Sequence, residues 1–333
     1  MTNFISIIIP NFNGSATIRK CLEAVFSSRY ANFEVIVVDD YSEDNSVEII
    51  KQFPCKLIRL DKPSGASKAR NIGALDSRGD ILFFTDADCL LRKDTLSLVA
   101  RTFSEGAPDS IIGGTYTPIP YDRSFYSVFQ SIFINYSETK QPKDPDYIAT
   151  HAMAIDATLF SKIGGFSEDF LPILEDVELS HRLRRSGYRL FMNPHILVQH
   201  IFNFSLIGSL HNAIRKSMYW TLYSIKNRDL LADSGTASLE LKINVASQLV
   251  NLVLLALWIL FRKSFLIYPL PLIFAFNLHI NAKLIKAFYA ANGFIFTCLA
   301  LVYYTLIYSL AVAVGAFAGV LKNYFPGFSK VRY

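Results

Sequence analysis

The stretch "ILFFTDADC", residues 81–89, decides the fold class of this chain. An apolar run stops abruptly at Thr85, and two carboxylates follow one residue apart, Asp86 and Asp88. A short, continuously apolar run is typical of a strand in a parallel sheet, which is covered on both faces. Ligands of such sheets bind beyond the carboxyl ends of the strands. The two aspartates are therefore expected at a ligand site.

Similar apolar runs alternate with helix-like stretches along the front of the chain. We expect strands at 4–9, 33–38, 56–60 and 81–85, and helices at 15–28, 45–53 and 64–75. Strands alternating with helices of this length imply βαβ units and a mostly parallel sheet. The predicted fold class is α/β, with a Rossmann-like, mostly parallel sheet followed by an α-helical transmembrane region.

Polar residues follow three of the predicted strands. They are "PNFNG" at 10–14, "DDYS" at 39–42 and the pair Asp86 and Asp88. The carboxyl ends of parallel strands meet at one rim, so the three clusters should gather there. Each cluster alone is ordinary turn chemistry. Three at one rim, two of them with paired carboxylates, favour a binding site.

Paired carboxylates either share a proton or hold a divalent metal. The spacing of Asp86 and Asp88 suits Mg²⁺ or Mn²⁺, which take oxygen ligands and commonly bind substrate phosphates as well. Two adjacent carboxylates repel each other, and a bound dication reverses the sign of that interaction. The pair therefore indicates a metal cofactor, either Mg²⁺ or Mn²⁺.

Six segments occur in a fixed order along the front half. They are "SIIIPNFNG", "VIVVDDYSEDNS", "GASKARNIG", "FFTDADC", "GGF" and "LEDVELSHRLRRSG". In this order they resemble the family 2 glycosyltransferases of the GT-A fold, over about residues 4–200. The resemblance implies a catalytic domain at 1–200 that takes a sugar from a nucleotide diphosphate sugar and inverts the anomeric carbon.

The resemblance also implies which residues bind the donor. Those lining the nucleotide pocket would be Pro10, Phe12 and Asn13, with Asp39 and Asp40 hydrogen-bonded to the base or ribose. Those meeting the nucleotide and diphosphate would be Lys68, Arg70 and Asn71. Asp86 would contact the sugar or ribose, Asp88 would be the main metal ligand, and His200 would complete the metal–diphosphate site.

The general base implied by the resemblance is Asp176. A sugar hydroxyl is a poor nucleophile, so a carboxylate must take its proton as it attacks. Asp176 lies at the start of a predicted helix, 175–186, where the helix N-terminus favours the ionised form. Arg182 on the same helix either contacts the diphosphate or lies on a solvated face. His151 and His181 are expected to be structural.

Two departures from related patterns bear on the substrate. Ala152 stands where the family often has an asparagine, so the sugar and the acceptor stay open. No Q-x-x-R-W follows the acidic motif, and "HRLRRSGYRL" stands there instead. We therefore expect transfer of one sugar per acceptor rather than synthesis of a threaded polymer.

The charge of the chain is divided unevenly. Residues 241–333 contain eight basic residues and no acidic one, whereas residues 1–240 contain 25 basic and 28 acidic residues. We predict a membrane domain at 243–333 with two to three transmembrane helices, at about 243–261, 265–281 and 295–320. Residues 201–242 are predicted to be an amphipathic segment at the membrane surface or an ordinary packed helix. A buried helical hairpin in a soluble protein is the alternative for the tail.

The expected location follows from what the front of the chain lacks. The first apolar run, 5–9, is too short for a signal peptide, so we expect an integral, multi-pass membrane protein whose catalytic domain faces the cytoplasm. The cysteines show no paired spacing and are expected to be reduced and structural. They are Cys21, Cys55, Cys89 and Cys298.

Taken together, the sequence predicts a membrane-anchored, metal-dependent hexosyltransferase of glycan biosynthesis. Its partners would be a nucleotide diphosphate sugar donor, a lipid-linked or other membrane-borne glycan acceptor and membrane lipids, with no nucleic acid. Two alternatives stay open. One is a polyprenyl-phosphate glycosyltransferase, whose acceptor is already an oxyanion, and the other is a non-catalytic nucleotide-binding membrane protein.

Overall fold

The computed structural model describes residues 3–105 and 110–325. The chain forms two compact units. Unit 1 comprises Met1–Arg123 and Glu138–Asn203, and unit 2 comprises Ser124–Ser137 and Phe204–Tyr333. The boundary after Asn203 lies close to the predicted end of the catalytic domain. The assignment of 124–137 to the second unit had no signal in the sequence.

Unit 1 is built on an eight-stranded sheet with the order β3-β2-β1-β4-β7-β6-β8-β5. Its first half is parallel, as predicted, and consists of β1 (Ile5–Asn11), β2 (Phe33–Asp39), β3 (Lys56–Arg59) and β4 (Ile81–Phe84). β1 and β4 are fully buried almost throughout, which explains their unbroken apolar runs. The predicted α/β class with a Rossmann-like sheet is confirmed.

The second half of the sheet is mixed. Its strands are β5 (Cys89–Leu91), β6 (Ser110–Tyr116), β7 (Met153–Asp156) and β8 (Arg189–His200). β7 pairs antiparallel with both β4 and β6, and β5 pairs antiparallel with the end of β8. This last pairing sets Cys89 opposite His200. It therefore brings the chain after β4 beside the end of β8.

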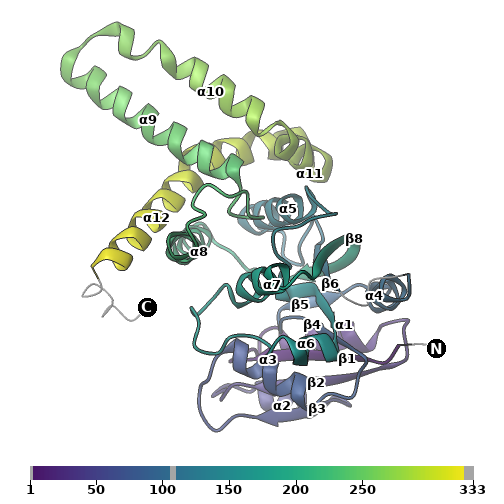
Figure 1. Cartoon of the computed structure of the whole chain (residues 1–333). Helices are drawn as coiled ribbons and strands as arrows, with labels where there is room; N and C mark the ends of the chain where they lie inside the picture. Colours follow the sequence, from purple (N-terminus) through teal and green to yellow (C-terminus); the bar gives the residue numbers. More distant parts are fainter. Residues whose placement is uncertain (1–2, 106–109, 326–333) are drawn as a thin grey trace. The chain divides into compact units, whose positions relative to one another are not determined.

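The helices of unit 1 connect the strands of the sheet (Figure 1). They are α1 (Ile18–Phe26), α2 (Ser46–Ile50), α3 (Ala66–Leu75), α4 (Thr95–Ser104), α6 (Ala157–Lys162) and α7 (Glu175–Arg185), with a 3₁₀ turn at Thr150–Ala152. Phe84 at the end of β4 packs on Phe160 and Phe166, with ring centroids 5.2 and 5.1 Å away. This aromatic contact anchors the segment before α7 to the strand that carries the acidic pair.

Unit 2 is helical. Its elements are α5 (Phe125–Thr139), α8 (Leu206–Asn227), α9 (Leu239–Phe261), a 3₁₀ turn (Ser264–Leu266), α10 (Pro269–Ile280), α11 (Ala282–Val302), a π-helical stretch (Tyr303–Tyr308) and α12 (Ser309–Tyr324). The helix of α11 is interrupted at Asn292 and Gly293, where Gly293 has a φ of 76°. Figure 1 shows α9 and α10 in green, drawn as neighbouring helices.

Two helical stretches of unit 2 are long and apolar enough to cross a membrane. They are Leu239–Phe261 and Ala282–Tyr324, and a shorter apolar stretch covers Ser264–Ile280. The predicted span 243–261 lies within the first and 295–320 within the second. The predicted span at 265–281 falls on the shorter stretch. Residues 326–333 of the predicted membrane domain lie outside the described residues.

Candidate active site

A cavity of about 460 Å³ lies at the carboxyl ends of β1 and β4 in unit 1. Residues at or just after the ends of four strands, two residues before α1 and two residues of α3 line it. They are Pro10, Asn11, Phe12, Asn13, Gly14, Ala16, Thr17, Asp40, Ala66, Arg70, Asp86, Ala87, Asp88, Ile201, Phe202 and Asn203. The structure therefore brings together the three polar clusters that the sequence placed at one rim.

Arg70 is the buried cation of this site. Its Nη2 donates to Asp86 Oδ1 at 2.7 Å and its Nη1 to Glu175 Oε1 at 2.6 Å, while its side chain is only 4% exposed. One guanidinium thus joins α3, the loop after β4 and the start of α7. Burial is the largest influence on Asp86 and opposes its ionisation, but the charge and hydrogen bond of Arg70 together with the charges of His151 and His200 outweigh it and lower the pKa of Asp86. Asp86 is therefore held as a carboxylate.

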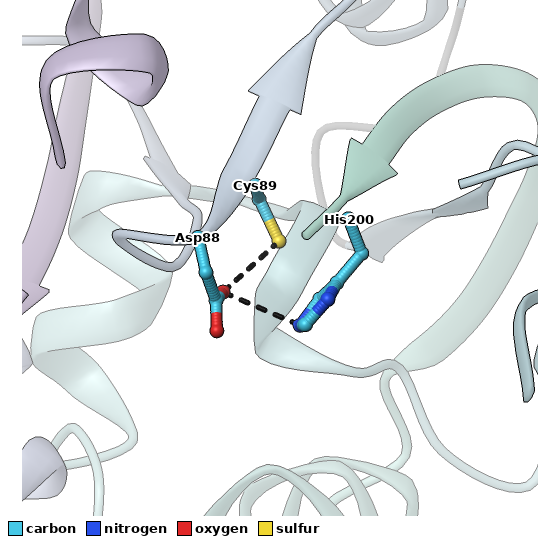
Figure 2. A group of neighbouring side chains, drawn as sticks. All are labelled: Asp88, Cys89 and His200. Carbon is cyan, nitrogen blue, oxygen red and sulfur yellow. Dashed lines mark hydrogen bonds and ion pairs between the residues drawn. The ribbon is translucent and has the colours of Figure 1, made fainter. Parts of the chain in front are cut away.

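Asp88 lies in a cluster that could hold a metal (Figure 2). Its Oδ1 is 3.3 Å from His200 Nε2 and 3.7 Å from Cys89 Sγ. The three ligand atoms all lie within 4.8 Å of one another. Carboxylate, imidazole and thiol groups are all ligands that divalent metals take in proteins. The predicted ligands Asp88 and His200 are therefore placed where one ion could reach both.

Cys89 and Asp86 differ from what the sequence predicted. The chain was expected to use Cys89 structurally, but its thiol lies beside Asp88 because β5 starts there and pairs with β8. Asp86 was expected to share the metal. It is absent from the group of possible ligands among the described residues, and its Oδ1 is engaged by Arg70. Burial and then the charge of Asp86 raise the pKa of Asp88 to about 7, which a bound dication would reverse.

Asp176 lies in the first turn of α7. Its Oδ1 accepts from the Val177 amide at 2.8 Å, and its Oδ2 is 3.4 Å from the Thr150 amide. We expected the helix N-terminus to favour the ionised form. Instead, burial and then the neighbouring Glu175 raise the pKa of Asp176 to about 6. Desolvation outweighs the helix dipole here, which leaves Asp176 ionised at neutral pH but more basic than an ordinary aspartate.

The two aspartates after β2 support loops. Asp39 is fully buried and accepts from Asn11 Nδ2 at 2.8 Å and from the Ser42 amide at 3.1 Å. Asp40 lines the cavity, but its two oxygens accept from the Ser64 and Gly65 amides at 2.6 and 2.8 Å. The expectation that Asp39 contacts the donor therefore needs correction, because its carboxylate is fully buried and hydrogen-bonded within the protein. Asp40 holds the start of α3 at the edge of the cavity.

Three further residues predicted to contact the donor do not line the cavity. Asn71 exchanges hydrogen bonds with the backbone of Phe166, at 2.8 and 2.9 Å. Arg182 donates to Gly165 O at 2.6 Å, and also to the carbonyl of Ile163 and the carboxylate of Glu178. Both side chains thus hold the glycine turn before α7, where Gly164 and Gly165 have φ of 84° and 65°. Lys68 lies outside the described cavity lining as well.

A buried pair below the acidic cluster had no signal in the sequence. His151 Nε2 lies 3.3 Å from Glu138 Oε2, which also accepts from Thr115 Oγ1 at 2.7 Å. The ring of Tyr116 stacks on that of His151, with centroids 4.0 Å apart. Burial is the largest influence on His151 and opposes its protonation, but Glu138, Asp86 and Asp176 together outweigh it and raise the pKa of His151. These residues come from distant segments, so only the folded chain brings them together.

Part of the chain matches a known family of enzymes. Residues 6–164 match the family model described as glycosyl transferase family 2. This part of the chain is similar to that family. It includes β1 to β4, Arg70 and the acidic pair after β4. It ends at Gly164, before Asp176.

Individual relatives cover parts of the chain. Glycosyltransferase GlyG of Streptococcus pneumoniae is 28% identical over 131 residues, which are 38% of this chain and 44% of the relative. An uncharacterized glycosyltransferase of Haemophilus influenzae is 30% identical over 192 residues, 54% of this chain and 61% of the relative. The chain thus spans less than two thirds of the length of either relative.

A solved structure resembles the fold over most of its length. It is the mannosyltransferase PcManGT from Pyrobaculum calidifontis in complex with GDP-Man and Mn²⁺. The TM-score is 0.59 at 19% identity, and the alignment covers 98% of this chain and 88% of the other. At this identity the likeness establishes the GT-A fold.

Replacing Arg70 with methionine should destabilise unit 1. Two carboxylates would lose their buried partner, which costs about 3–5 kcal/mol. Labelling of the fully buried thiols of Cys21 and Cys89, followed against urea in the full chain, measures the unfolding of unit 1. The control is Arg78→Met, which breaks an ion pair with Glu34 whose arginine is 77% exposed and should cost less than about 1 kcal/mol. Equal destabilisation by the two variants would contradict a central role for Arg70.

Proposed function

We propose that this chain is a membrane-anchored, metal-dependent, inverting glycosyltransferase. It would move one sugar from a nucleotide diphosphate sugar to a hydroxyl of a lipid-linked or other membrane-borne acceptor. One observation carries the proposal. Asp86 and Asp88 line the cavity at the carboxyl ends of the strands together with Arg70, and Arg70 also lies close enough to Asp176 for the charges of the two groups to shift each other's pKa.

The chain's own residues divide the work of such a transfer. Asp176 takes the proton of the acceptor hydroxyl as that oxygen attacks the anomeric carbon, and the nucleoside diphosphate leaves from the opposite face. A base whose pKa lies near 6 is ionised at neutral pH and still able to accept a proton. Pro10, Phe12 and Asn13 line the cavity where the nucleotide would lie. Phe12 offers a ring that is 57% exposed.

The metal would be held by Asp88 and His200, with Cys89 beside them. A divalent cation there supplies positive charge to the leaving diphosphate. Support for a divalent ion comes from the ligand set itself and from the Mn²⁺ bound to the structural relative PcManGT. The chain's contribution is to hold Asp88 and His200 on adjacent ends of β5 and β8.

Membrane anchoring is supported by α9. Only 6% of the apolar stretch of this helix is buried within the protein, although the helix is long enough to cross a bilayer. Although α9 contacts α10 and α12, most of its apolar side chains are not covered by protein. Lipid would cover them. The acid-free, basic character of residues 241–333 agrees with a region that meets anionic headgroups.

Donor binding should require metal and Asp88. We expect one of UDP, GDP or dTDP to bind the detergent-purified full chain with Mn²⁺ and at least about tenfold more weakly without it. Asp88→Asn should lose the increase in nucleotide affinity that Mn²⁺ produces. Glu105→Gln, which changes an exposed surface residue, should keep that increase. Isothermal titration calorimetry measures both. Unchanged Mn²⁺-dependent binding in the Asp88 variant would remove the metal assignment, and absence of binding by all three nucleotides would favour a degenerate site.

Turnover should depend on ionised Asp176. Because its pKa is about 6, kcat/KM should reach a plateau above that pH and fall as pH drops below it. Asp176→Asn should lower kcat by about 10²–10⁴-fold and remove the fall of kcat/KM at low pH. Asp94→Asn, at the exposed start of a helix, should change neither kcat nor the pH dependence of kcat/KM. Release of nucleoside diphosphate from the donor found by calorimetry is the readout. Full activity of the Asp176 variant would instead support a phosphate acceptor, as in a polyprenyl-phosphate glycosyltransferase.

The chain should stay in membranes under alkaline carbonate, which strips peripheral proteins. The expectation rests on α9 and on the apolar stretch from α11 to α12. Leu255→Arg places a charge in the exposed apolar part of α9. It should raise the fraction of the protein that carbonate releases, because a charge at the membrane centre costs about 3 kcal/mol. Leu255→Ile is the control. Release of the unaltered chain by carbonate would refute membrane integration.

A further inference from the structure

Cys89 places a sulfur atom beside Asp88 and His200 (Figure 2). Cys89 begins β5 and lies opposite His200, which ends β8, because the two strands pair antiparallel. Asp88 directly precedes Cys89, and the Ile201 amide donates to the Asp88 carbonyl at 2.9 Å, which continues this pairing past the strand ends. Backbone hydrogen bonds therefore hold a carboxylate, a thiol and an imidazole together.

The three ligand atoms are spaced as they would be around one tetrahedral ion. Zn²⁺ binds about 2.0–2.2 Å from carboxylate oxygen or histidine nitrogen and about 2.3 Å from thiolate sulfur. Tetrahedral angles then separate oxygen from nitrogen by about 3.3 Å and oxygen from sulfur by about 3.5 Å. Asp88 Oδ1 is 3.3 Å from His200 Nε2 and 3.7 Å from Cys89 Sγ, and all three atoms lie within 4.8 Å of one another. One ion can therefore bind all three.

A sulfur ligand changes which ions such a site favours. Carboxylate oxygen suits Mg²⁺ and Mn²⁺, whereas thiolate sulfur and imidazole nitrogen suit Zn²⁺, and mixed sites bind Co²⁺ more tightly than Mn²⁺. The Cys89 thiol donates to Asp88 Oδ1 at 3.7 Å. An ion bound to both atoms takes the place of that proton, which passes to the solvent, and the sulfur binds as a thiolate. No electron is transferred, so the step needs no oxidant or reductant.

The burial of the three side chains fits an ion held by protein on one side and reached from the other. Cys89 is fully buried and the side chain of His200 is 13% exposed. The side chain of Asp88 is 40% exposed and lines the cavity. Catalytic zinc sites commonly have three protein ligands and leave one position for water or substrate. An ion bound here is therefore reachable from the cavity.

We propose that Cys89 is a third protein ligand at this site and that the site binds Zn²⁺ more tightly than Mg²⁺ or Mn²⁺. The inference rests on the metal site of the proposed function, to which it adds a residue and a preference. An ion that prefers oxygen is held through Asp88 and His200. An ion that prefers sulfur is held through Cys89 as well, so Zn²⁺ and Mn²⁺ compete for one place.

The absorption spectrum of bound Co²⁺ tests the sulfur ligand directly. Co²⁺ substitutes for Zn²⁺, and its bond to a thiolate gives an intense near-ultraviolet charge-transfer band that oxygen and nitrogen ligands do not give. The full chain is purified in detergent without a polyhistidine tag and titrated with Co²⁺ in the absence of nucleotide. We expect a thiolate band that saturates at a single site and disappears when Zn²⁺ is added. Cys89→Ser and Cys89→Ala should both abolish the band.

The affinities for two ions separate a metal ligand from a residue that only packs. Losing even a hydrogen-bond partner of a metal ligand costs about 10–100-fold in affinity, so Cys89→Ser should weaken Zn²⁺ binding by at least about tenfold. The affinity for Mn²⁺, which prefers oxygen ligands, should stay nearly unchanged. Isothermal titration calorimetry measures both. A packing defect would weaken the binding of both ions alike.

The matched controls are Cys21→Ser and Cys298→Ser, and both should keep the band. Cys21 is as buried as Cys89 but donates to the Asp86 carbonyl, at 3.6 Å, and Cys298 is exposed. Bound Co²⁺ without a thiolate band, a band that persists in Cys89→Ser, or equal losses of Zn²⁺ and Mn²⁺ in a normally folded variant would each overturn the proposal. The proposed function would survive these results, because Mn²⁺-dependent nucleotide binding through Asp88 is measured separately.

Discussion

The bridge that Arg70 makes between Asp86 and Glu175 is the constraint on which the rest of the site depends. A guanidinium has a planar set of donors and can meet two carboxylates at once, which a lysine cannot do in the same way. Here the two acids come from elements separated from Arg70 by 16 and 105 residues of sequence. A buried ion group of this kind gives little net stability over an apolar core, but breaking it is costly. Its value is in position, because it fixes the loop after β4 against the first turn of α7.

Arg70, burial and neighbouring negative charge together give the acids around this cation different pKa values. Arg70 lowers the pKa of Asp86, whereas burial and adjacent negative charge raise those of Asp88 and Asp176. Asp86 is therefore held as a carboxylate, a bound dication would reverse the raised pKa of Asp88, and Asp176 has a pKa of about 6. Pairs of acids whose surroundings move their pKa values apart are a common basis for assigning separate roles in catalysis. The three acids to which the resemblance assigned separate roles thus also differ in their electrostatic surroundings.

The parallel half of the sheet could be predicted because burial on both faces leaves an unbroken apolar run, as in 81–84, and polar residues mark where each run ends. The other half could not, because β5 has three residues and its pairing with β8 joins positions more than one hundred residues apart. The same limit applies to single side chains. Asp39 and Asp40 look alike in sequence, but only the fold shows that one is sealed beneath the rim and the other caps a turn. His151 and Glu138 meet through contacts that no local pattern encodes.

The helix α8 makes a packing contact that composition alone does not predict. Its bases and aromatics fit either a segment lying on the membrane surface or an ordinary packed helix, and α8 packs closely on α12 inside unit 2. A side chain at Gly319 would come within 2.6 Å of the Met218 carbonyl, and Gly315 has the same close contact with the backbone at Ile214. Glycines four residues apart allow two helix backbones to approach where lipid provides no hydrophobic drive between them. α8 is therefore held against α12 by close contact between the two helix backbones. Lys216 of α8 lies beside apolar side chains of unit 2 because this contact holds it there.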